Sequence, residues 1–349
     1  MSIHHNSGAS LEDVRAIGAG GQNIREWQRA RGIDRAQQVS IRKLAHMRYQ
    51  HPDLDEITVF MKDFGMDVVQ KTEDEVWYRG YGTDAYVYYA KKGPRKFLGG
   101  TFEVDTYEDL EKAARIDGAT AITAMNGAPG GGHILTLRDP EGHAMNLIHG
   151  QAAVEAIKSP EKLIINHGDE KPRVKKFQRF EEGPAAVHKL GHYGLCVNDF
   201  EGMMDWYTRH FNIVPSDLLT IKAPAGGTQE VAIFAHIDRG TELVDHHSIF
   251  LSKAEKSHVH HCSFEVHDMD SQQLGHHWLA SKNYRSVWGV GRHILGSQLF
   301  DYWWDTTGNM IEHYADGDLV DESTPLHRMP AGNESLYVWG PDVPATFLD

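Results

Sequence analysis

The sequence predicts an α+β protein of two similar halves, and repeated patterns in it are the reason. His46 and His192 each open a strand-like segment, and helix-like runs follow over residues 54–63 and 200–210. Each half then contains a second strand-like segment that ends in Phe-Glu-Val. An internal repeat of this length indicates two units with the same architecture.

A turn and a final strand complete the repeat. Residues 139–142 and 305–308 both begin with Asp and end with Gly. These residues favour tight turns, because Asp can bond its own backbone and Gly accepts a positive φ. Beyond the second turn, strand alternation places Met310, Glu312 and Tyr314 on one face. We therefore expect two short strands joined by the 305–308 turn.

The repeat also predicts how the chain is divided. We expect a helical leader over residues 1–40, a first domain over 41–150, a linker over 151–187, a second domain over 188–316 and a tail over 317–349. The leader, which contains Trp27, is interpreted as a tail or subunit-packing arm. The linker is expected to include a short helical run at 152–157. The aromatic tail is expected to pack back over the second domain or a neighbouring subunit.

The composition excludes several classes of partner. The 349 residues carry a formal charge of −14, which argues against nucleic acid or an anionic membrane as the main partner. No run of 18 apolar residues and no signal-peptide pattern is present. Two cysteines do not make a secreted disulfide scaffold. We expect a soluble, cytoplasmic protein.

A carboxylate in an apolar strand is the strongest chemical signal. Burying Glu312 is costly unless a charged group or a metal ion meets it, and an ordinary ion pair is one possibility. His192 and His261 occupy matched positions at the start of two strands. Together the three residues form the set of two histidines and one carboxylate that binds non-haem Fe(II) and leaves positions open for substrate and O₂.

The first half lacks most of this set. Gly99 or Gly100 stands where the second half has His261, and Asn146 stands where it has Glu312. Only the first histidine, His46, is retained, and one neutral ligand cannot hold a divalent metal. The first half is therefore predicted to be metal-free and the second half catalytic.

The spacing of the last strands resembles a known signature. Gly291-Arg-His293, then Tyr302, Asp305, Gly308 and Glu312, is similar to the signature of type I extradiol ring-cleavage dioxygenases of the vicinal oxygen chelate superfamily. The resemblance covers roughly residues 40–315. It departs from the family pattern at Thr306, where Pro is usual, and at Asp301, where an apolar residue is usual. Neither position is a ligand.

The resemblance implies a fold and a metal site. The fold would be the two-domain vicinal oxygen chelate fold, with paired βαβββ modules forming an open barrel in each half. The metal would be Fe(II), with Mn(II) as the alternative, held by His192, His261 and Glu312. The reaction would cleave the ring of a catechol with O₂ beside its two hydroxyls, giving a product of the hydroxymuconic semialdehyde type. The protein would form a homo-oligomer.

Three further residues match functional positions of the family. His247, at the start of the strand-like run 244–251, matches a histidine that acts as acid and base beside substrate and O₂. His293 and Tyr302 match groups that contact the oxygen intermediates, and a tyrosine hydroxyl can bond a substrate oxygen. A surface histidine pair, a strand-edge histidine and a core tyrosine are the structural alternatives. Possible ring-binding residues are Trp206, Trp288, Arg292, Trp303 and Trp304.

Two other functions are open for the same fold. A glyoxalase-type isomerase or lyase would polarise a carbonyl without consuming O₂, but such sites usually take four protein ligands from both halves. A metal-free module that binds a small aromatic compound or an antibiotic would have no reason to keep three ligands. The spaced His293 and Tyr302 also favour the dioxygenase.

Overall fold

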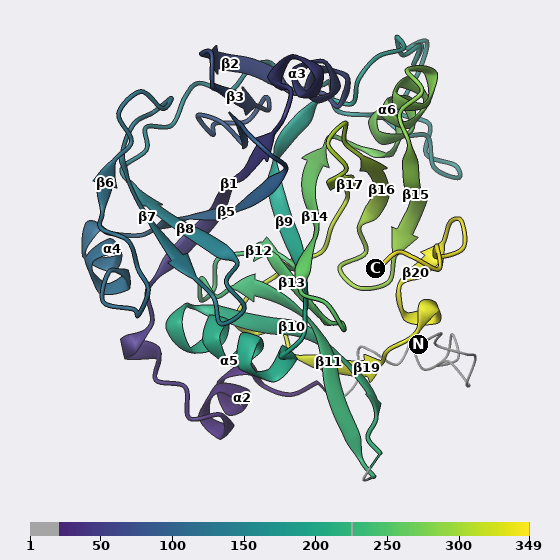
Figure 1. The fold of residues 1–349 in the computed structure, drawn as a ribbon. Helices are drawn as coiled ribbons and strands as arrows, with labels where there is room; N and C mark the ends of the chain where they lie inside the picture. Colours follow the sequence, from purple (N-terminus) through teal and green to yellow (C-terminus); the bar gives the residue numbers. More distant parts are fainter. Residues whose placement is uncertain (1–20, 225, 349) are drawn as a thin grey trace.

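The computed structural model describes residues 21–224 and 226–348, which form two curled β-sheets that lie side by side (Figure 1). The first sheet has eight strands in the order β2-β3-β4-β1-β5-β8-β7-β6, and the second has ten in the order β19-β10-β11-β13-β9-β14-β17-β16-β15-β20. Without its two outermost strands, the second order matches the first position by position. The predicted repeat is confirmed, and the fold is the vicinal oxygen chelate fold.

Each half contains two βαβββ modules. The first half consists of β1 (Ile41–His51), α3 (Leu54–Asp63), β2 (Asp67–Lys71), β3 (Glu75–Arg79), β4 (Tyr88–Lys92), β5 (Lys96–Val104), α4 (Tyr107–Ala113), β6 (Thr123–Ala124), β7 (His133–Arg138) and β8 (Ala144–His149). The second consists of β9 (Val187–Val197), α5 (Phe200–His210), β10 (Ile213–Lys222), β11 (Thr228–Ile237), β12 (Val244–Asp245), β13 (Ile249–Lys253), β14 (His258–Val266), α6 (Met269–Ser281), β15 (Ser286–His293), β16 (Leu299–Trp304) and β17 (Met310–Ala315).

Helices α3 and α5 begin and end where the sequence predicts them. Each follows an aspartate whose side chain accepts hydrogen bonds from the first backbone N–H groups, Asp53 for α3 and Asp199 for α5. An N-terminal cap of this kind satisfies donors that have no partner within the helix. The predicted turn between β16 and β17 is also present, closed by a bond from the Gly308 N–H to the Asp305 carbonyl.

The leader packs on its own chain. The predicted helical stretch is reduced to α2 (Ile24–Ala30) and the short 3₁₀ helix η2 (Arg35–Gln37), and the expectation for residues 1–20 lies outside the described residues. Trp27 is buried, and Arg25 forms an ion pair with Asp238 in the second half. The described part of the leader therefore packs against the second barrel.

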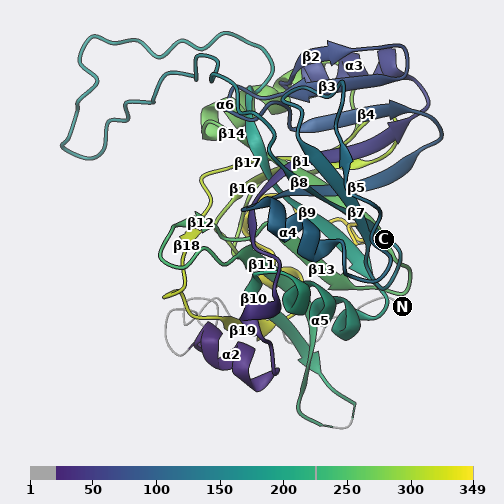
Figure 2. The same ribbon diagram turned by 90° about the vertical axis from the view of Figure 1, so that its left-hand side faces the viewer.

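The linker contains no helix, so the helical run expected at 152–157 is wrong. The backbone N–H groups of Val154 and Ile157 bond instead to the carbonyls of Thr83 and Tyr81 in the first half. A donor used in this way is not available for a helical bond. Figure 2 shows the segment between β8 and β9 extending away from the two barrels as a long loop.

The tail crosses the second barrel, as predicted. It forms β18 (Leu319–Val320), β19 (His327–Pro330), the 3₁₀ helix η3 (Asn333–Ser335) and β20 (Tyr337–Trp339). Strand β19 pairs with β10, and β20 pairs with β15. Phe347, near the end of the described chain, is buried among aromatic side chains of the second half.

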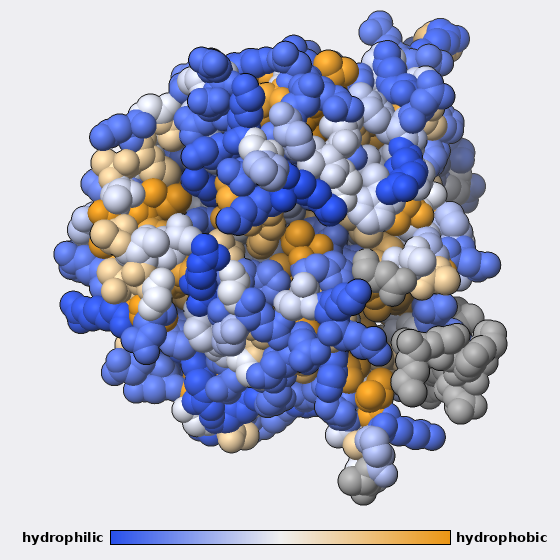
Figure 3. Space-filling view, in the orientation of Figure 1, coloured by the Kyte–Doolittle hydropathy of each residue, from blue (hydrophilic) through white to orange (hydrophobic). Residues whose placement is uncertain are grey.

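The two halves share one continuous core. Phe64, directly after α3, is fully buried and stacks on His313 of β17 with a ring separation of 3.6 Å. It also meets Phe264 of β14 edge-on. The face seen in Figure 3 is mostly hydrophilic. No helix within residues 21–224 and 226–348 has the length and apolar character needed to cross a membrane.

Phe64 offers a test of this shared core. We expect Phe64→Ala to lower the free energy of unfolding by about 3–5 kcal/mol, because it removes a buried ring and leaves a cavity between the halves. Urea denaturation would measure the change. Val59→Ala is the control, since Val59 lies on α3 just before Phe64 but is 58% exposed. Equal effects of the two substitutions would contradict a shared core at this position.

Candidate metal centre

Three neighbouring strands bring the predicted metal ligands together. His192 lies on β9, His261 on β14 and Glu312 on β17, and these strands are adjacent in the second sheet. The Nε2 atom of His192 is 3.1 Å from Nε2 of His261 and 3.2 Å from Oε2 of Glu312. The third pair, His261 Nε2 and Glu312 Oε2, is 3.7 Å apart. All three side chains are buried.

The protonation of this group suits a metal ion. Burial alone would raise the pKa of Glu312, but the imidazoles of His192 and His293 bring it well below its ordinary value, so the carboxylate is ionised. Burial holds the pKa of His261 well below its ordinary value, so this imidazole is neutral. Ligands must be deprotonated to bind a metal. A divalent cation bound by these three side chains would compensate the buried charge of Glu312.

The tail orients one of the ligands. The Nε2 atom of His260 lies within hydrogen-bond distance of the Phe347 carbonyl, which can only accept. Neutral His260 then presents the lone pair of Nδ1 to Nδ1 of His261, 2.6 Å away. His261 therefore carries its proton on Nδ1 and directs the lone pair of Nε2 toward the other ligands, an arrangement common around bound metals. No pattern in the sequence predicts this contact between His260 and the tail.

A cavity of about 550 Å³ opens above the ligands. His192 and His261 line it, together with His247, His293 and Tyr302. Its apolar wall includes Phe234, Phe250, Leu295, Phe347 and Leu348. A mostly apolar cavity of this size with a few converging polar groups is typical of a small-molecule site.

His247 is part of the cavity wall beside a ligand. Its ring lies 4.1 Å from the ring of His192, and only 3% of the residue is exposed. Burial, followed by the nearby His192, lowers its pKa well below the ordinary value. His247 is therefore neutral, which rules out the surface histidine pair as an interpretation.

His293 and Tyr302 form a hydrogen-bonded pair on the opposite wall. The Nδ1 atom of His293 donates to the Leu336 carbonyl 2.7 Å away. Its Nε2 atom lies 3.0 Å from the Tyr302 hydroxyl, within hydrogen-bond distance. Burial raises the pKa of Tyr302 well above its ordinary value, so the phenol keeps its proton.

Known proteins resemble this chain in sequence and in fold. Residues 189–313 match the model of the Glyoxalase/Bleomycin resistance protein/Dioxygenase superfamily. The match covers the part of the second half that contains His192, His261 and Glu312. Metapyrocatechase 2 of Cupriavidus necator is 27% identical over 315 residues, which cover 88% of this chain and 92% of that protein.

Two solved structures share the fold. Homoprotocatechuate 2,3-dioxygenase from Arthrobacter globiformis superposes with a TM-score of 0.73 at 17% identity, covering 89% of this chain and 91% of that one. The Mn(II)-bound glyoxalase from Novosphingobium aromaticivorans superposes with a TM-score of 0.71 at 18% identity, covering 88% and 93%.

The five ring-binding candidates do not line the cavity. Trp288 packs behind Tyr302 and Trp303 donates to Asp301, while Arg292 bonds Asp316. Trp206 packs beside Phe211, and Trp304 packs beside Arg285. The residues that sequence reasoning missed are the apolar wall named above and Lys253. One signal was available: Gly194 shares the face of His192, and a Cβ there would lie 2.8 Å from Phe250.

Both departures from the family signature have a structural account. Asp301 is fully buried, but it accepts hydrogen bonds from Trp303 Nε1 at 2.7 Å and from His276 Nδ1 at 2.9 Å. These donors compensate the carboxylate. The turn after Asp305 closes without proline at Thr306, because Asp305 Oδ1 accepts the backbone N–H groups of Thr307 and Asn309.

The first half keeps the framework of the site without its ligands. Thr101 lies opposite both His46 and Asn146 in the first sheet, as Ser263 lies opposite His192 and Glu312 in the second. Asn146 stands in the place of Glu312 and bonds to the Leu98 carbonyl and to Thr136. Within the described residues, the only group of histidine, cysteine and acidic side chains close enough to share a metal is the one in the second half.

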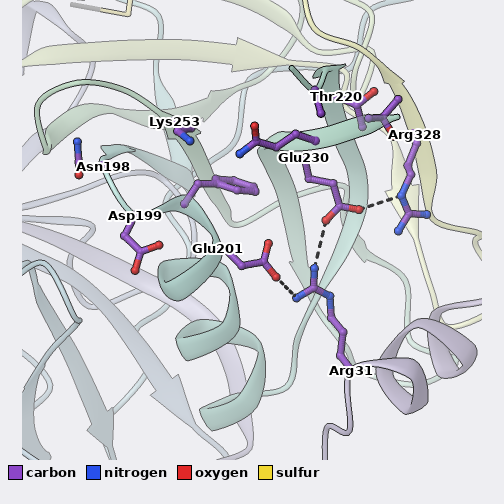
Figure 4. Close-up of a pocket in the computed structure, with 12 residues that line it drawn as sticks. Arg31, Asn198, Asp199, Glu201, Thr220, Glu230, Lys253 and Arg328 are labelled. Atoms are coloured by element: carbon purple, nitrogen blue, oxygen red, sulfur yellow. Dashed lines mark hydrogen bonds and ion pairs between the residues drawn. The ribbon is translucent and has the colours of Figure 1, made fainter. Parts of the chain in front are cut away.

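A second hollow, of about 620 Å³, lies elsewhere on the second half (Figure 4). Arg31 bonds Glu201 and Glu230 across it, and Arg328 also bonds Glu230. These arginines are committed to structural ion pairs, and none of the metal ligands lines this hollow. The cavity above His192 and His261 is therefore the functional candidate.

The role of His260 can be tested by metal binding. We expect His260→Phe to weaken metal affinity roughly 10- to 100-fold, because the proton on His261 Nδ1 loses its acceptor. Competition with a chelator would measure the affinity. His258→Phe is the control, since His258 bonds a loop carbonyl at Lys256. An unchanged affinity in His260→Phe would show that the tail does not orient His261.

Proposed function

We propose that this protein is an extradiol dioxygenase that uses Fe(II) and O₂ to cleave the ring of a catechol beside its two hydroxyls. The product is of the hydroxymuconic semialdehyde type. The observation that carries the proposal is the group His192, His261 and Glu312, with two of its members on the floor of an apolar cavity. Two imidazoles and one carboxylate leave up to three coordination positions for two substrate oxygens and O₂.

The comparisons support the reaction class. Metapyrocatechase 2 is similar along most of both chains, and homoprotocatechuate 2,3-dioxygenase has the same fold. Iron is proposed over manganese because this ligand set is the one used by non-haem Fe(II) oxygenases. The fold itself accommodates manganese, as the Mn(II)-bound glyoxalase shows.

The bound metal would supply Lewis acidity toward the catechol hydroxyls and a position for O₂ beside the ring. The chain supplies the remaining functions. His247 is neutral and lines the cavity, so it can take a proton from a substrate hydroxyl and return it later. Tyr302 keeps its hydroxyl proton and can bond a substrate oxygen, while His293 holds that hydroxyl in place. Phe234 and Phe250 exclude water from the ring.

The proposal extends to organisation and location. Residues 41–150 form a structural domain, and residues 188–316 form the catalytic domain. The leader precedes the first domain, the linker joins the two and the tail follows the second. We further propose a cytoplasmic homo-oligomer. The linker has apolar side chains available for a contact with a second copy, including Phe177, which is 75% exposed, and Val174, which is 67% exposed. Sedimentation velocity would contradict this if it showed a monomer.

A glyoxalase-type isomerase is the second candidate, because a glyoxalase shares the fold. The single carboxylate and the metal-free first half favour the dioxygenase. Oxygen uptake separates the two reactions. Anaerobically Fe(II)-loaded protein given a panel of catechols should consume O₂ and form a yellow product. Metal binding at one ion per chain without O₂ uptake would favour the isomerase, and no metal binding would favour a binding module.

The two halves should respond differently to loss of equivalent residues. We expect Glu312→Ala to abolish stoichiometric metal binding and turnover, because it removes the only anionic ligand. Asn146→Ala, its counterpart in the first half, should leave both nearly unchanged. Metal content per chain and O₂ uptake would measure the effects. Equal losses in the two variants would contradict the assignment of the metal to one half.

His247 should affect turnover rather than binding. We expect His247→Phe to retain the metal and the catechol but to lower kcat by about 10²-fold or more, or to divert the product, because proton transfer loses its imidazole. Steady-state kinetics with product analysis would measure this, together with metal content. An unaltered kcat and product would remove His247 from the reaction.

A further inference from the structure

A buried chain of polar groups lies directly behind His247. The Nε2 atom of His246 is 2.7 Å from Oδ2 of Asp217, and its Nδ1 atom is 3.1 Å from Nδ1 of His247. All three residues are almost completely buried. The chain therefore runs from a carboxylate through one imidazole to a second imidazole that faces the cavity.

The direction of the hydrogen bonds follows from the carboxylate. An ionised carboxylate only accepts, so His246 must donate its Nε2–H to Asp217. With a single proton on the His246 ring, its Nδ1 atom has only a lone pair, and His247 donates its Nδ1–H to it. The nitrogen left for a molecule in the cavity is Nε2 of His247, without a proton.

We propose that Asp217 and His246 are positioning residues that hold His247 in this single tautomer and ring orientation. In that form His247 meets a substrate hydroxyl as an acceptor. The opposite tautomer would present an N–H group to that hydroxyl and could not take its proton. The inference rests on the proposed function only in giving His247 its role; the hydrogen-bonded chain itself rests on the geometry.

The backbone around His246 is fixed on both sides. Its N–H bonds the Asp318 carbonyl at 3.0 Å, and its carbonyl accepts from the Ser216 hydroxyl. Asp217 lies on β10 next to Ser216, and its second oxygen is 3.8 Å from Nδ1 of His327. The chain is therefore part of the packed sheet rather than a mobile side-chain contact.

The first half shows what the fold contains without this chain. Tyr193 pairs with Ile249 in the second sheet, and Met47 pairs with Tyr88 in the first. Tyr88 and Ile249 therefore occupy equivalent positions in the two sheets. The pair of residues that ends two positions earlier is Ala85-Tyr86 in the first half and His246-His247 in the second. The half without the metal ligands therefore has no histidine in either place, and the chain belongs to the half that contains them.

Two substitutions of His246 separate the hydrogen bond from packing. His246→Phe removes the acceptor for His247, whereas the side-chain oxygen of His246→Asn can replace Nδ1. His46→Phe is the control, since His46 is also fully buried but lies in the metal-free half. The first measurement is ¹⁵N NMR of histidine-labelled, metal-free protein, with the His247 signals identified by their loss in His247→Phe. The second is kcat and KM of the Fe(II)-loaded protein with a catechol.

We expect the wild-type protein and His246→Asn to show His247 protonated on Nδ1. His246→Phe should lose that preference, with kcat lowered roughly 10- to 100-fold and KM changed less than about 3-fold. His246→Asn should recover most of kcat, and His46→Phe should match the wild type. A His247 protonated on Nε2 in the wild type, or a tautomer unaffected by His246→Phe, would overturn the inference.

The same measurements would give a different pattern of results if the proposed function were wrong and the hydrogen-bonded chain were right. A changed tautomer with unchanged turnover would support the hydrogen-bonded chain and would show that His247 is not the proton-transfer group. Absence of O₂ uptake by the wild-type protein would refute the dioxygenase, and the NMR result would still decide whether Asp217 and His246 position His247.

Discussion

The buried carboxylate of Glu312 is the constraint on which the second half depends. A charge with no exposure in the middle of a sheet is unfavourable unless opposite charge or a metal ion compensates it. The strand order β9-β14-β17 places His192 and His261 next to that carboxylate. The three side chains project from three successive strands, so the curl of the sheet brings them together around one point. Removing the curl would separate the ligands even if every strand were retained.

The first half shows how the same framework is stabilised without a metal. Asn146 replaces the carboxylate with a neutral amide, whose two ends bond the Leu98 carbonyl and the Thr136 hydroxyl. A neutral, satisfied group needs no cation. This half is then available for a structural role, and Phe64 at the end of α3 packs against His313, the neighbour of Glu312. The first half thereby supports the strand that carries Glu312.

Much of the fold and the ligand set could be predicted because both depend on local periodicity. Strand alternation fixes which side chains share a face, and the repeat identifies which strands are equivalent, so His192, His261 and Glu312 stand out from the sequence. The cavity wall could not be predicted in this way. Phe234 and Phe250 meet only through pairing of β11 with β13, and Phe347 arrives from the tail. The helix expected at 152–157 failed for a similar reason, since distant carbonyls take its N–H groups.

Two pairs of adjacent histidines at this site have the same hydrogen-bonding arrangement. In each pair the first imidazole bonds an outer acceptor, and its Nδ1 then meets Nδ1 of the second, which faces the cavity. The outer acceptor differs: a backbone carbonyl of Phe347 behind the ligand His261, and the carboxylate of Asp217 behind His247. A ligand has only to keep one lone pair directed at the metal, and a neutral carbonyl is sufficient for that. A group that takes up a proton becomes cationic, and a carboxylate at the end of its chain stabilises that charge far better than a carbonyl does. The chemistry of the outer acceptor thus distinguishes the histidine proposed to bind the metal from the histidine proposed to transfer protons.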